Sequence, residues 1–378
     1  MILRLWAMVL ALMIVASSAG AESLEEGIAG AIGGLDLKPL LEAMEGQTLV
    51  EGDGAEILAA LASGRTALSP EGTLQWLTGE AMGIFRGSLW RVTRLMIPAL
   101  LTAAGQHLSG KKRGASRAAH YVGMLALCGF LISDMKEYVE LCNHTVGEMA
   151  GLMQAIFPLL ITLLAAVGGT ASSAFYQPAV MAAAGAMTTL IQHITLPFAV
   201  SVAVLTMADG LSGGVQLGRM RQLFRQVANW TLGFGFTVFI GVMTVQGLGA
   251  AAVDGVSIRT AKYAMDNFIP VVGGMFADTV DTLVGCSLLV ENAVGILGLI
   301  LLLGKLLSPL LQTAAAMLLY RGASALLQPM ADTPLNKSIG EYGDVFSLLF
   351  IIELSVGAMF LLLCAQLLMV GNLTVMLR

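Results

Sequence analysis

The chain has 378 residues, a net charge of -5 and only 12% charged residues, against roughly 25% in soluble domains, while 57% of its residues are hydrophobic. With a mean hydropathy of +0.82, this composition predicts an all-α, polytopic helical membrane protein. The small net charge forms no basic stripe, which excludes the phosphate-neutralising surface of a nucleic-acid binder. Four scattered cysteines indicate neither a zinc site nor a disulfide framework. We therefore expect no nucleic-acid partner, no metal and no cofactor.

Residues 1–21 are predicted to be a signal peptide. Arg4 precedes an apolar run, and the small residues Ala19-Gly20-Ala21 suit a signal peptidase; an uncleaved first anchor is the alternative. Residues 22–85 should then form short amphipathic helices outside the cytoplasm, because their leucines recur at helical spacing. Ser69-Pro70-Glu71 is a typical helix start. We interpret this region as a small helical cap, with a separate binding domain as the alternative.

Residues 86–378 are predicted to form the membrane domain, with about seven or eight crossings of about 20 apolar residues each. The expected crossings lie at 92–108, 118–132, 149–167, 230–250, 283–303, 306–327 and 346–370. Lys and Arg favour the cytoplasmic side of a membrane. This rule places the basic loop at 109–117 inside and the acidic connection at 133–148 outside.

A possible re-entrant hairpin at 179–208 follows from the same rule. The arginines at 219–225 should lie inside, which requires an even number of passes before them, and a buried hairpin provides two. One long tilted helix is the alternative, and it would place these arginines outside. With the hairpin, Lys305 and Arg378 lie inside, while the acidic loop at 332–344 lies outside.

Local patterns for enzymes are incomplete in this sequence. Gly210-Leu211-Ser212-Gly213 matches the short motif of intramembrane serine proteases, but His193 precedes it, whereas those proteases carry their histidine on a later helix. No zinc-peptidase motif occurs among the histidines. We therefore predict that the protein is not an enzyme, with an intramembrane hydrolase as the less favoured alternative.

Several polar side chains fall within predicted crossings. Glu291 and Glu353 are functional candidates because a carboxylate at membrane depth must be paired or face water, although interhelical hydrogen bonds are the competing explanation. Pairs of small residues four apart, such as Gly83 with Gly87, allow close helix packing. They fit internal packing of the bundle at least as well as the interface of a possible homo-oligomer.

The charged segment at 251–282 is unusual in such an apolar chain. A helix is expected up to Asp266, Pro270 should end it, and a second helix should begin at Met275. We assign a possible interaction or gating role at the outer face to Asp254, Arg259, Lys262, Asp266, Asp278 and Asp281. A solvated face on the membrane surface is the alternative for each of these charges.

The same region resembles the stage III sporulation protein AE family. The matching motifs are, in order, Val245-Gln246-Gly247, Asp254-Gly255-Val256, Arg259-Thr260-Ala261-Lys262, Phe268-Ile269-Pro270-Val271-Val272-Gly273, Asp281-Thr282 and Ser287-Leu288-Leu289. The likeness extends more loosely over about 149–370, and Glu291 departs from it, since a basic residue is expected there.

The resemblance implies a mother-cell membrane protein of endospore-forming bacteria. Such a protein would be a non-enzymatic core or gate of the channel or secretion-like complex between mother cell and forespore. Its implied partners are a secretion-type ATPase, ring-forming proteins and membrane lipid. A self-sufficient permease for a small solute is the alternative, favoured by the hairpin and by Glu353.

Overall fold

The computed structural model describes residue 33 and residues 38–44, 54–64, 70–108, 113–211, 217–268, 273–329 and 334–376. All regular elements in these ranges are helices, which confirms the predicted all-α class. They are α3 (Lys38–Met44), α4 (Gly54–Ala62), α5 (Pro70–Leu108), α6 (Arg113–Ala166), α7 (Thr170–Leu190), the π-helical turn η1 (Ile191–Thr195), α8 (Leu196–Leu211), α9 (Gly218–Phe268), α10 (Gly273–Leu327) and α11 (Pro334–Met376).

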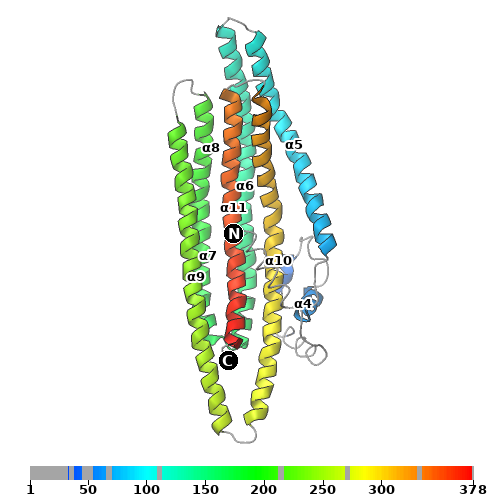
Figure 1. The fold of residues 1–378 in the computed structure, drawn as a ribbon, viewed down its shortest axis with the longest axis vertical. Helices are drawn as coiled ribbons and strands as arrows, with labels where there is room; N and C mark the ends of the chain where they lie inside the picture. The colour runs from blue at the N-terminus through cyan, green and yellow to red at the C-terminus, as the bar shows by residue number, and fades with distance from the viewer. Residues whose placement is uncertain are drawn as a thin grey trace.

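Five long antiparallel rods form the body of the molecule (Figure 1). They are α6, the α7–η1–α8 unit, α9, α10 and α11, and within the described residues these five are long and apolar enough to cross a membrane. The apolar spans contain 42 to 46 residues each, or about 63–69 Å at 1.5 Å per residue. Each rod is therefore about twice as long as the hydrocarbon core of a bilayer is thick.

The predicted hairpin at 179–208 is wrong, because the chain runs through this region without reversing. α7 continues through η1 into α8 as one rod. Pro197 explains the wider turn, since it has no N–H to donate to the carbonyl of His193 and its ring crowds that carbonyl. The helix accommodates the proline by a local π turn instead of breaking.

Two predicted loops are also wrong. The crossings expected at 118–132 and 149–167 lie on the single helix α6, and those expected at 283–303 and 306–327 lie on the single helix α10. Three of the acids that indicated the first loop, Asp134, Glu137 and Glu148, pair with side chains of α5 or α10. Glu148 of α6 receives a hydrogen bond from Lys305 of α10 at 2.9 Å, so each charge is satisfied in the middle of its helix.

The ends of the rods revise the predicted sidedness. The end of α8 and the start of α9 lie at the same end of the molecule as the end of α5 and the start of α6, and we call this the arginine end. The end of α9 and the start of α10, which we call the tip of the α9–α10 pair, lie at the other end (Figure 1). Both placements agree with the prediction. The errors at α6 and at 179–208 each change the number of passes by one, so together they leave the predicted side unchanged. The acidic residues at 332–344 were predicted opposite Arg225, but Arg225 forms an ion pair with Asp344 at 3.6 Å. α11 ends at Met376, away from the arginine end, where the prediction had placed the C-terminus (Figure 1).

The N-terminal region is helical, as predicted. α3 and α4 are short and amphipathic: Leu40 and Leu58 are fully buried, while Glu42 and Glu56 are exposed. α5 begins at Pro70, the proline of the predicted helix start. The signal peptide predicted at 1–21 lies outside the described residues.

The core of the bundle is the contact between α10 and α11. Apolar side chains along α11, such as Phe346, Leu349 and Leu363, are fully buried. Gly295 of α10 lies so close to Leu368 that an added methyl group would overlap it. This close approach lets two long helices share one continuous apolar seam.

Candidate functional site

Asp254 of the charged segment holds together two helices. It is 1% exposed, and its carboxylate accepts hydrogen bonds from the backbone N–H groups of Ala171 at 2.7 Å and of Ser172 at 2.8 Å. These groups belong to the first turn of α7, where Gly169 provides no side-chain cap. An anion is favourable at the positive end of a helix dipole. Asp254 therefore caps α7 from α9, and its carboxylate is committed to this contact.

The other predicted residues lie towards the tip of the α9–α10 pair, away from the arginine end (Figure 1). α9 ends at Phe268 and α10 begins at Gly273, so two helices flank the predicted break, and Pro270 itself lies outside the described residues. Arg259 is exposed on α9. The side chains of four predicted residues lie outside the described set: Lys262, Asp266, Asp278 and Asp281.

A second polar site lies along the other side of the bundle, where α5 packs against α6 and α10. Arg91 of α5 donates two hydrogen bonds to Glu137 of α6, at 2.7 and 2.5 Å. One turn further along, Arg94 donates to Asp134 at 2.9 Å, and Tyr320 of α10 donates to the same carboxylate at 2.5 Å. Asp134 is buried, so these two donors compensate its charge.

The same site continues towards the middle of the bundle. Lys305 of α10 donates to Glu148 of α6 at 2.9 Å. Ser308 of α10 donates to Glu80 of α5 at 2.8 Å, and Gln312 donates to Ser308 at 3.3 Å. Together with the pairs above, these contacts form what we call the α5–α6–α10 polar cluster.

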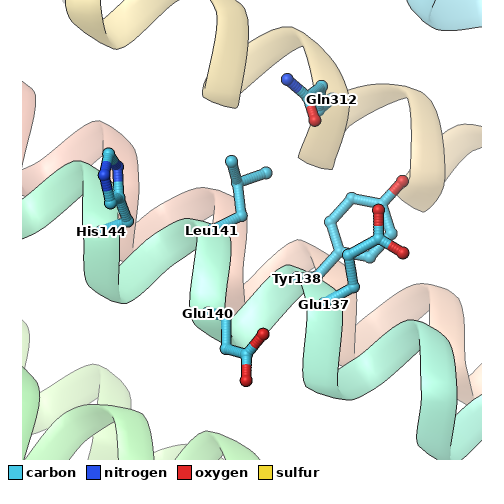
Figure 2. Close-up of a pocket in the computed structure, with 6 residues that line it drawn as sticks. All are labelled: Glu137, Tyr138, Glu140, Leu141, His144 and Gln312. Carbon is cyan, nitrogen blue, oxygen red and sulfur yellow. The ribbon is translucent and has the colours of Figure 1, made fainter.

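A pocket opens on the surface of this cluster (Figure 2). It has a volume of about 320 Å³ and is lined by Glu137, Tyr138, Glu140, Leu141, His144 and Gln312. Gln312 faces the α6 side chains from α10 in Figure 2. The side chain of Glu140 is 68% exposed and that of His144 is 74% exposed. This surface suits water or a polar partner, because exposed carboxylates are costly against lipid.

The sequence contained a signal for this cluster. Arg91 and Arg94 are three residues apart on one helix, and Asp134 and Glu137 are three apart on the next, so antiparallel packing brings each cation to one acid. The hydrogen bonds to Glu137 raise the pKa of the Arg91 guanidinium, against a smaller opposing effect of desolvation. The prediction from sequence assigned these acids to a loop, so the cluster was not expected.

The two carboxyl groups predicted at membrane depth are both fully buried. Neither oxygen of Glu291 has a hydrogen-bond partner, and the carboxyl lies against Gly371, where an ideal Cβ would come within 2.3 Å of Oε1. The neighbouring Asn372 donates to Asn292 at 3.0 Å. Glu353 accepts one hydrogen bond at 2.8 Å and has one oxygen without a partner.

The remaining candidate groups give no assembled site in the described part of the chain. All four cysteines are free and buried: Cys128, Cys142, Cys286 and Cys364. Within the described ranges, no three His, Cys, Asp or Glu residues are grouped as metal ligands. Ser212 of the possible hydrolase motif lies outside the described residues, and His193 lies in η1.

Comparison with known proteins agrees with the resemblance seen in the motifs. The family model for stage III sporulation protein AE matches residues 53–371. A stage III sporulation protein AE of Bacillus subtilis (strain 168) is 31% identical over 263 residues, which cover 70% of this chain and 66% of that relative. The matched region thus spans just under two thirds of the relative's length. No solved structure matches the chain.

Proposed function

Because the chain belongs to the stage III sporulation protein AE family, we propose that it is a non-enzymatic core or gate of a channel or secretion-like complex between mother cell and forespore. The family and the five apolar rods make it a multi-pass membrane protein of sporulation. In the proposal it resides in the mother-cell membrane around the forespore. Its partners there would be a secretion-type ATPase and ring-forming proteins.

The surface pocket beside the α5–α6–α10 polar cluster carries this proposal. Glu140 and His144, which line it, are exposed on α6, whereas the exposed face of α9 carries large apolar side chains such as Trp230 and Phe234. Contact with lipid is unfavourable for the surface with Glu140 and His144 and favourable for the apolar face of α9. A protein with two such faces suits a complex in which one side borders lipid and the other borders water or a subunit.

Affinity purification from sporulating cells tests the proposal. We expect the tagged chain to co-purify with an ATPase and ring-forming proteins, and a double variant Glu140→Ala, His144→Ala to lose part of this set. Gln222→Ala is the matched control, because Gln222 is exposed on α9 away from the cluster. Purification without such partners, together with normal sporulation of a deletion strain, would refute the proposed role.

We also propose that the tip of the α9–α10 pair is a docking or gating surface on the outer side of the membrane. The positive-inside rule supports this orientation, because the arginine end then faces the cytoplasm. Reversing charge with Arg259→Glu and Lys262→Glu should impair sporulation more than Arg219→Glu, an exposed control at the other end. Equal effects of the two changes would count against a specific surface at the tip.

A permease for a small solute is the second candidate. The structure has a π turn in place of the hairpin that had favoured a permease. The remaining support for a permease comes from the buried carboxyls of Glu291 and Glu353. Solute flux in vesicles that contain only this chain would favour the permease. Vesicles that stay tight until partners are added would favour the channel component.

A further inference from the structure

Glu353 lies at the junction of α6, α10 and α11. It is fully buried, and the hydroxyl of Thr313 on α10 donates to its Oε2 at 2.8 Å. Its Oε1 has no hydrogen-bond partner. From α6, the buried thiol of Cys142 is the titratable group that faces the carboxyl.

No ion pair balances a charge on Glu353 within the described residues. Two cations, on α10 and α5, are bound to other acids. Lys305 is bound to Glu148 at 2.9 Å, and Arg94 is bound to Asp134 at 2.9 Å. A buried carboxylate without a cation is far less stable than a neutral carboxyl, because it has lost its hydration without compensation.

The hydrogen bonds around Thr313 lead to the same conclusion. Its hydroxyl has a single proton but lies near three acceptors: Glu353 Oε2 at 2.8 Å and the carbonyls of Pro309 at 3.1 Å and Leu310 at 3.2 Å. If Glu353 is ionised, the hydroxyl can donate its one proton to only one of these three acceptors. If Glu353 carries a proton on Oε2, the carboxyl donates to Thr313 Oγ1, and Thr313 donates to the Pro309 carbonyl.

We propose that Glu353 is a proton-binding site inside the bundle, and that loss of its proton loosens the junction of α6, α10 and α11. The bound ligand is one proton, exchanged with water. Two residues that line the surface pocket, Leu141 and Gln312, are the chain neighbours of Cys142 and Thr313, which face the carboxyl. The ionisable groups at that pocket are Glu137, Tyr138, Glu140 and His144.

The proton site is independent of the channel proposal, since it concerns occupancy of one carboxyl. Infrared spectra of the full-length protein in lipid nanodiscs detect the carbonyl stretch of protonated carboxyls. At neutral pH we expect Glu353→Gln to remove one such band. Thr313→Val should shift that band, because the carboxyl loses the oxygen to which it donates, while Glu291→Gln should leave it in place.

Bands unchanged by Glu353→Gln at neutral pH would overturn the proposal, because the carboxyl would then be ionised. Folding supplies a second readout. Glutamine resembles the neutral carboxyl but has no proton to release on unfolding. Glu353→Gln should therefore match the wild-type unfolding midpoint at acidic pH, where the unfolded chain also keeps the proton, and exceed it at neutral pH, where the packed bundle binds a proton that the unfolded chain releases. A Glu353→Gln chain that fails to fold would show that the site requires a carboxylate.

Discussion

Asp254 illustrates how one acidic side chain can fix the packing of two long helices. Replacing it by alanine leaves the N–H groups of Ala171 and Ser172 without partners in a buried place. We expect Asp254→Ala to cost about 1–3 kcal/mol, and Asp254→Asn to cost less because one acceptor oxygen remains. Thermal unfolding of the purified protein measures both. Arg259→Ala is the control on the same helix, and an equal loss there would contradict the capping role.

Gly371 gives a second prediction for a single residue. A Cβ at this position would meet the carboxyl of Glu291 at 2.3 Å. Gly371→Ala should therefore destabilise the bundle by about 1–3 kcal/mol. Glu291→Ala should relieve part of this loss in the double variant, which a double-mutant cycle detects. Gly151→Ala is the matched control, since open space surrounds Gly151 on α6; there the change should be neutral or stabilising by about 0.5–1 kcal/mol.

At the scale of elements, the π turn between α7 and α8 determines how the two halves of one rod face the core. Buried residues continue across it, from Met187 and Ile191 to Leu196 and Ala199. A π turn holds one residue more than a regular helical turn. The turn therefore absorbs a residue without rotating α8 away from the bundle.

Deletion variants test this role of the π turn. Removal of His193, which is exposed in η1, should convert the turn to a regular helix and leave the protein folded. Removal of Val200 in α8 should rotate the preceding or following segment by about 100° and disrupt the core. The fraction of monodisperse protein in size-exclusion chromatography reports the result. Equal tolerance of both deletions would show that the π turn has no such role.

Local signals in the sequence predicted where helices begin and end but not which polar residues lie within them. Ser69-Pro70 marked the start of α5, which begins at Pro70, and α9 ends at Phe268, shortly before Pro270 in the sequence. Glu148 appeared to belong to a loop because its partner, Lys305, is 157 residues away in the chain. From the sequence alone, a charged residue in a loop cannot be distinguished from one that pairs with a distant residue across the bundle.

At the scale of the whole molecule, the antiparallel order makes a prediction about sidedness. Arg219 is near the start of α9 and Lys337 near the start of α11, and both of these helix ends lie at the arginine end; Asp278 is near the start of α10, which lies at the opposite end. Single cysteines at Arg219 and Lys337 should react with a membrane-impermeant thiol reagent from one side, and a cysteine at Asp278 from the other. The native cysteines are buried and should give little background. If Lys337→Cys instead reacted from the same side as the cysteine at Asp278, the sidedness of 332–344 predicted from sequence would be correct.

The length of the rods also has a practical consequence for handling the protein. Leu223 and Val256 are exposed apolar residues on α9, 33 positions and therefore about 50 Å apart. A detergent belt is about as thick as one hydrocarbon layer, about 30 Å, so it cannot cover both residues on an upright helix. In detergent alone, the chain should therefore keep part of this apolar surface uncovered and give a smaller monodisperse fraction than the chain extracted from sporulating cells with its neighbours still bound.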